Sequence, residues 1–216
     1  MILSLSLLCS FCNPIVNISQ TSDKDPGILE VTNFGTHASL ATPPRSTMSS
    51  KNLKDLNGKW SMNKDLSSDV SPVLEIQGIN AMMRKAVGFA PVHLDVTQPS
   101  ADEIHIKQST TANIPAIDEE WYPGDHEWRE QSDKLLGKVR SRSRWAKVLE
   151  LEGFDGFLLK DLRGEDEVIQ ADVESRDGDW KAVQVWCFEG ENFVRRVLTT
   201  GGGKKAETKL IYDFKS

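Results

Sequence analysis

The sequence predicts a mainly all-β fold: a closed antiparallel up-and-down barrel with a short helical lid after its first strand. Beyond Trp60, short segments of alternating apolar and polar residues are separated by Gly, Pro, Asp and Asn. A single helical stretch interrupts this run near its start. Evenly spaced short strands favour a closed meander, because closure leaves no unpaired sheet edge.

Residues 1–50 differ in composition from the rest of the chain. An apolar run over 1–12 precedes a segment rich in Ser, Thr, Asn and Pro. The pattern is compatible with a signal peptide and linker, with a disordered tail, or with an error of gene prediction. A signal peptide implies the secretory pathway or secretion, whereas a start at Met48 implies the cytoplasm. In each case we expect one folded barrel domain over residues 51–216.

The elements of this domain follow from local patterns. The first strand contains Trp60, and Ser67 or Asp69 is expected to cap the helical stretch that follows, in which Gly78 and Gly88 are interruptions. Later strands are expected at 92–96, 104–107, 138–144, 146–151, 167–175, 181–188, 193–199 and 208–214.

Composition excludes several classes of function. The 216 residues carry a net charge of −6, and no run of Lys or Arg exceeds two residues, which argues against nucleic-acid binding. No apolar stretch reaches the roughly 18 residues of a membrane-spanning helix. The four histidines and three cysteines lack metal-ligand spacing. We therefore expect no nucleic-acid partner, membrane span, metal or cofactor.

Gly58-Lys59-Trp60 resembles the Gly-x-Trp motif that opens the first strand of calycins, the lipocalins and fatty-acid-binding proteins. The helical stretch after it and the terminal Tyr212 are also similar to fatty-acid-binding proteins, so the resemblance covers nearly all of residues 53–216. Those proteins close with Arg-x-Tyr, which holds the ligand carboxylate, whereas this chain has Leu-Ile-Tyr at 210–212. The departure favours a neutral or weakly acidic ligand over a fatty acid.

A closer resemblance is to a fungal group of calycin-like proteins that includes the hetero-Diels–Alderases of tropolone–sesquiterpenoid biosynthesis. The shared motifs are Gly58-Lys59-Trp60, Arg84-Lys85-Ala86, Ser143-Arg144-Trp145, Val185-Trp186-Cys187-Phe188-Glu189, Arg195-Arg196-Val197 and Tyr212-Asp213-Phe214. The resemblance implies a cofactor-free pericyclase of secondary metabolism that joins a tropolone quinone methide to a humulene-type sesquiterpene in meroterpenoid biosynthesis. Its partners would be small apolar and tropolone-type molecules. The alternatives are a non-catalytic, lipocalin-like carrier of a small hydrophobic ligand and an interaction domain with a filled barrel.

Strand alternation requires one of the neighbours Arg195 and Arg196 to point into the barrel. An unpaired guanidinium is costly to bury, so the inward arginine needs a partner. A structural salt bridge, stacking on Trp60, and a polarising contact to a ligand each satisfy that need. The acidic run 118–120 is either a solvated face or the source of a carboxylate base.

A pericyclase needs donors for the heterodiene oxygens and flat or apolar walls for its two reactants. The expected catalytic donors are Arg144, Arg196 and Tyr212. The expected substrate-binding residues are Trp121, Trp145, Gln184, Trp186, Arg195, Leu210, Met82 and Met83. For each tryptophan, packing in the core or at the rim is an equally compatible role.

Overall fold

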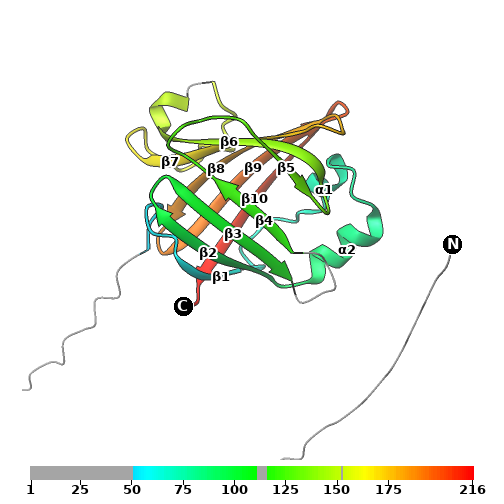
Figure 1. Cartoon of the computed structure of the whole chain (residues 1–216), viewed down its shortest axis with the longest axis horizontal. Coiled ribbons are helices and arrows are strands. Elements are labelled where there is room, and N and C mark those ends of the chain that lie inside the picture. The colour runs from blue at the N-terminus through cyan, green and yellow to red at the C-terminus, as the bar shows by residue number, and fades with distance from the viewer. Residues whose placement is uncertain (1–50, 111–115, 152) are drawn as a thin grey trace, which may run out of the picture. The chain divides into compact units, whose positions relative to one another are not determined.

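The computed structural model describes residues 51–110, 116–151 and 153–216. In these residues, ten antiparallel strands form one sheet in the order β4-β3-β2-β1-β10-β9-β8-β7-β6-β5, which curls into a nearly closed barrel (Figure 1). The expected fold class is therefore confirmed. The expectations for residues 1–50 lie outside the described residues.

The elements follow one another as a meander, with the helices after the first strand. Their bounds are β1 (Gly58–Met62), α1 (Ser71–Ile76), α2 (Ala81–Phe89), β2 (Val92–Ser100), β3 (Glu103–Thr110), β4 (Ile117–Trp121), β5 (Arg129–Asp133), β6 (Gly137–Lys147), the 3₁₀ turn η1 (Val148–Leu151), β7 (Glu167–Ser175), β8 (Trp180–Glu189), β9 (Asn192–Gly201) and β10 (Lys204–Phe214). None of the helices among the described residues has the length and apolar character needed to cross a bilayer.

β1 lies between β2 and β10 in the sheet, and it pairs with both of them. It therefore connects the first strands of the meander to the last one. The backbone N–H of Lys59 donates to the carbonyl of Ser216 at 2.7 Å, and the N–H of Lys215 donates to Lys59 at 2.8 Å. Trp60 is almost fully buried, and its indole N–H donates to the carbonyl of Leu56 at 2.8 Å. The Gly-x-Trp motif therefore anchors one end of the barrel interior.

The helical stretch consists of two short helices, and α1 packs against β9 and β10. The expected cap Asp69 accepts the backbone N–H of Ser71 at 2.9 Å, but the N-cap position of α1 is occupied by Val70, which makes no side-chain capping bond. The other expected cap, Ser67, lies farther from the helix, and its hydroxyl accepts the N–H of Ile211 at 2.9 Å. Asn80, which the sequence reasoning missed, caps α2 by accepting the N–H of Met83 at 3.0 Å.

Three strand expectations need correction. The segments 138–144 and 146–151 were expected as two strands, but β6 runs unbroken to Lys147 and continues into η1. β4 and β5 were not expected, because their sequences Ile-Asp-Glu-Glu-Trp and Arg-Glu-Gln-Ser-Asp contain too few apolar residues to show a clear alternation.

The sheet has an apolar core on each of its faces. The interior core contains Trp60, Trp186 and Phe193. The outer core contains Leu151 and Leu158 from the connection between β6 and β7, packed against outward residues of the wall strands. The middle of the sheet is therefore covered on both faces, and β8 and β9 are apolar on both.

We expect Gly58→Ala to destabilise the fold. The φ angle of Gly58 is +121°, and an added Cβ would lie 2.5 Å from the carbonyl oxygen of Ser216. The cost should be about 1–3 kcal/mol of unfolding free energy, measured by urea denaturation. The control is Gly88→Ala in α2, where no atom lies within 4 Å of the added Cβ and stability should hold or rise. Equal unfolding midpoints for Gly58→Ala and the parent chain would contradict the prediction.

Candidate active site

The barrel interior contains a cavity with two adjoining lobes, of about 120 Å³ and about 170 Å³. The larger is partly lined by α1, α2 and the residues beside them, and we call it the helix lobe. The smaller is bounded by β4 and β5, which are not hydrogen-bonded to each other in the described chain, and we call it the seam lobe. The residues that line both lobes are Gln77, Ile117, Glu119, Leu136, Gln184, Arg195 and Val197.

Arg195 is the inward member of the Arg195–Arg196 pair and is only 5% exposed. Its Nη2 lies 2.9 Å from Glu119 Oε2, and its Nη1 lies 3.3 Å from Glu119 Oε1. The Nε and Nη2 atoms also donate to Gln184 Oε1 at 3.2 Å and 2.9 Å. The guanidinium carbon lies 4.7 Å from the centre of the Trp186 ring. The inward arginine is thus paired with Glu119 and stacked on Trp186 rather than on Trp60.

Two indoles fix the groups that hold Arg195. The Trp121 N–H donates to Glu119 Oε2 at 2.9 Å, and the Trp186 N–H donates to Gln184 Oε1 at 3.0 Å. Gln184 therefore uses its oxygen for all these bonds, and its amide nitrogen donates to no acceptor among the described residues. That nitrogen is a hydrogen-bond donor available to a ligand.

The charges of this cluster are set by burial and by the partners. Burial opposes the charge of Arg195, but Glu119 and Tyr212 together outweigh burial and raise the pKa of the guanidinium. Burial raises the pKa of Tyr212 to about 12, although hydrogen bonding and charge from Arg195 act in the opposite direction. At neutral pH the cavity therefore presents a cation and a protonated phenol, which are both hydrogen-bond donors.

Six of the expected site residues come together around this cavity or its floor. They are Trp121, Gln184, Trp186, Arg195, Leu210 and Tyr212. They belong to β4, β8, β9 and β10. Alternation places Gln184 with Trp186, and Leu210 with Tyr212, on one face, because one outward residue separates the members of each pair.

Both remaining arginines of the expected site lie on the outer face. Arg144 projects from β6, and its Nε donates to Gln170 Oε1 at 2.6 Å. Arg196 is buried in the outer core, where it donates to Glu189 Oε1 at 2.7 Å and to the carbonyl of Phe157 at 3.2 Å. Neither lines either lobe of the cavity.

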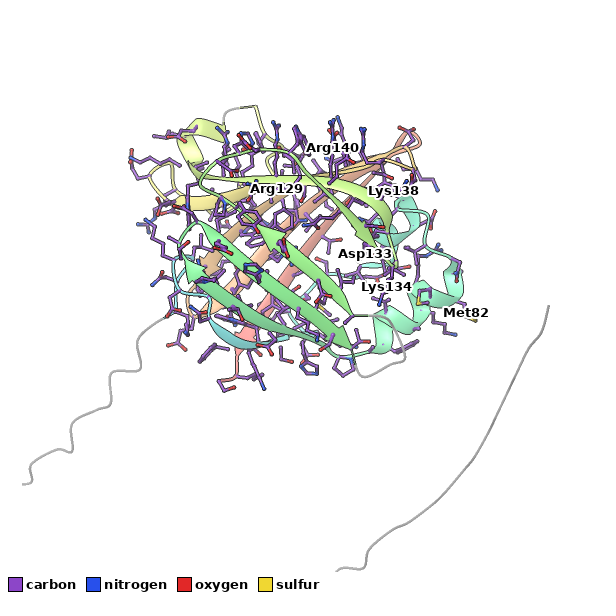
Figure 2. The ribbon with its side chains drawn as sticks, viewed as in Figure 1. Met82, Arg129, Asp133, Lys134, Lys138 and Arg140 are labelled. Carbon is purple, nitrogen blue, oxygen red and sulfur yellow. The ribbon has the colours of Figure 1, made fainter. Side chains whose placement is uncertain are left out.

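The other expected contacts are spread around the barrel. Trp145 packs at the edge of the interior core, and its indole donates to Asp102 at 2.8 Å. Met82 projects from α2 and is 82% exposed (Figure 2). Met83 is half-buried on the same helix. None of these three lines either lobe.

Several cavity residues were not singled out from the sequence. Glu119 had been considered only as part of an acidic run, yet Ile117, Glu119 and Trp121 alternate along β4 and all line the cavity. Thr208 lies two residues before Leu210 on β10 and lines the helix lobe, and its buried hydroxyl has no partner in the described structure. In both cases the residue lies two positions from an expected site residue on the same strand, and this spacing indicates that the two side chains share a face.

Comparisons with known proteins bear on what this cavity does. No model of a known protein family matches the chain. The chain is 29% identical over 184 residues to the probable pericyclase scpY of Mollisia scopiformis, a match that covers 81% of this chain and 94% of that protein. It is 28% identical to the pericyclase pydY of Acremonium sp, with 81% and 97% covered. The resemblance to pericyclases is confirmed. The expectation of an enzyme is confirmed by the same two relatives.

Solved structures confirm the calycin-like architecture. Fatty-acid-binding protein 1 of Echinococcus granulosus matches with a TM-score of 0.51 and 12% identity, covering 74% of this chain and 98% of that one. Lipid binding protein 8 of Caenorhabditis elegans matches with a TM-score of 0.52 and 11% identity, covering 74% and 94%. At these identities the likeness concerns the fold.

A double-mutant cycle at the buried ion pair should show strong coupling. Arg195→Met leaves the Glu119 charge buried without its partner, and Glu119→Gln does the same to Arg195. Each variant should lose about 3–5 kcal/mol of unfolding free energy. The double variant should cost clearly less than the sum, because neither charge then lacks a partner. Urea unfolding measures all three. The control is Arg140→Met on the outer face, whose ion pair with Glu174 is one-third exposed and should contribute about 1 kcal/mol or less. Equal losses for the two arginine variants would contradict the prediction.

Stability should fall at alkaline pH because of Tyr212. The unfolded chain releases the tyrosine proton near pH 10, whereas the native chain keeps it up to about pH 12. The unfolded state therefore binds fewer protons in this window, and the free energy of unfolding decreases as pH rises. Tyr212→Phe should remove this part of the decrease, as measured by urea unfolding at about pH 9 and about pH 11.5. Tyr122→Phe is the control, and this variant should keep most of the alkaline decrease in unfolding free energy, since Tyr122 is far less buried. An unchanged decrease in Tyr212→Phe would contradict the assignment.

Proposed function

We propose that this protein is a pericyclase that catalyses a hetero-Diels–Alder cycloaddition between a tropolone quinone methide and a humulene-type sesquiterpene in meroterpenoid biosynthesis. The observation that carries the proposal is the similarity to two pericyclases, which extends over 81% of this chain and over nearly the full length of both relatives. A match of that extent involves most of the barrel rather than one short motif.

The reaction requires no nucleophile. The O=C–C=CH₂ unit of the quinone methide and the C=C bond of the olefin form one C–O and one C–C bond, and three π bonds become one. No atom leaves and no electron is supplied from outside. Holding the two reactants in register can contribute up to about 7–11 kcal/mol to lowering the barrier. A cavity with two adjoining lobes supports this part of the proposal.

The polar cluster supplies the electrostatic part of the proposal. Electron density moves onto the heterodiene oxygen as the bonds form, so donors aimed at that oxygen stabilise the transition state. Arg195, Tyr212 and the free amide nitrogen of Gln184 are donors in the cluster. In this proposal Arg195 takes the role that sequence reasoning gave to Arg144 and Arg196. Because Glu119 and Trp186 hold Arg195 in place, the donors need little rearrangement during the reaction.

The test mixes the purified chain with a humulene-type olefin and a hydroxymethyl-tropolone precursor of the quinone methide. We expect faster product formation and a single stereochemical outcome compared with the protein-free mixture. Tyr212→Phe should lower kcat roughly a hundredfold, because it removes one donor and leaves the ring in place. Arg140→Gln on the outer face is the control and should keep the parent rate.

Two results would contradict the proposal. The first is a yield and stereochemistry equal to the protein-free control. The second is tight retention of one reactant without turnover, detected by native mass spectrometry, which would favour the carrier alternative.

A further inference from the structure

The two lobes of the cavity differ in the chemistry of the walls that they do not share. The helix lobe is bounded by Val70, Val73 and Leu74 around α1, by Val87 of α2 and by Leu210 of β10. These aliphatic side chains offer dispersion contacts, and the unshared polar residues of this lobe are Gln108, Thr208 and Tyr212. The helix lobe therefore suits a flexible hydrocarbon.

The seam lobe has a different wall. Its unshared residues include the polar residues Gln131 and Ser141, together with Trp121 and Trp180. Flat aromatic faces pack well against a planar ring, and polar side chains can pair with the oxygens that the ring carries. The seam lobe therefore suits a planar, oxygenated ring.

The place where β4 and β5 face each other without backbone pairing in the described chain forms a separate boundary of the seam lobe. β4 and β5 stand at the two ends of the sheet order and share no ladder hydrogen bonds among the described residues. Glu119 and Trp121 come from β4, and Gln131 and Asp133 come from β5, so side chains rather than backbone pairing form this wall. Figure 2 shows Asp133 at the end of β5.

Both lobes meet at the same polar groups. Glu119, Gln184 and Arg195 line each of them. A reactant in either lobe can therefore reach the cluster, and two reactants in different lobes would meet beside it.

We propose that the two lobes are separate subsites: the helix lobe binds the apolar olefin, and the seam lobe binds the tropolone-type ring with its oxygens toward Arg195 and Gln184. The C–O and C–C bonds then form at the junction of the lobes. This inference rests on the proposed function and assigns its two substrates to places in the cavity.

Energetics favour this assignment over its reverse. In the helix lobe the unshared polar groups are Gln108, Thr208 and Tyr212, so a tropolone oxygen placed against Val73, Leu74 or Val87 would lack a donor, at a cost of about 1–3 kcal/mol. An olefin in the seam lobe would cover Gln131 and Ser141 without pairing them, at a similar cost for each group. The assignment proposed here avoids both penalties.

The experiment titrates the isotope-labelled chain with tropolone and with α-humulene, separately and together, and follows backbone and indole NMR signals. Tropolone should shift signals of the seam lobe, including the Trp180 indole, and humulene should shift those of α1 and α2. The two probes should bind at the same time. Val87→Phe, which narrows the helix lobe, should weaken humulene binding about tenfold and leave tropolone binding within about twofold. Ala182→Leu, which narrows the seam lobe, should do the reverse.

Competition between the probes for one lobe, equal effects of both variants on both probes, or binding of neither probe would overturn the two-subsite assignment. The rate of product formation by the parent chain is measured in parallel and tests the proposed function separately. Acceleration without separate subsites would overturn only this inference. Separate subsites without acceleration would support the assignment and overturn the catalytic proposal.

Discussion

The ion pair between Arg195 and Glu119 joins the middle of the sheet to one of its ends across the barrel interior. Arg195 belongs to β9, whereas Glu119 belongs to β4, which pairs only with β3 in the described sheet. A buried guanidinium without a counter-charge would cost several kcal/mol, so the folded chain must keep β4 close enough for the contact. The same contact places a charged group beside both lobes. The position of the seam strand and the polarity of the cavity therefore depend on one interaction.

Aromatic packing explains why the cavity occupies only part of the barrel. The ring centres of Trp121 and Trp186 lie 5.2 Å apart, those of Trp186 and Phe193 lie 5.7 Å apart, and those of Phe193 and Trp60 lie 5.8 Å apart. Trp60, Trp186 and Phe193 line neither lobe, so their rings fill the interior beyond the polar cluster. The outer core supports β8 and β9 from behind. Gln184 and Arg195 are thus carried by strands packed on both faces, which favours a fixed arrangement of donors.

The local sequence pattern was sufficient to predict the barrel and many of the residues around the cavity. It was not sufficient to predict which face of every strand points inward. Alternation required that one of Arg195 and Arg196 point inward, and it placed Gln184 and Trp186 on one face. It could not choose between the arginines, because the outer core makes Val185 and Val194 as buried as their inward neighbours. Where both faces of a strand are apolar, the period-two signal loses its direction.

The choice of Arg195 over Arg196 follows from contacts distant in sequence. Glu119 lies 76 residues before Arg195, and its own strand is short and acidic, so no local pattern connects the two. A site that works by orienting reactants needs no fixed spacing of nucleophile and base, and it leaves no compact motif for that reason. The evidence in such a sequence is spread over the strands that shape the cavity. A similarity that extends over most of the chain is therefore more informative about this kind of activity than any single motif, and strand register decides which residues take part.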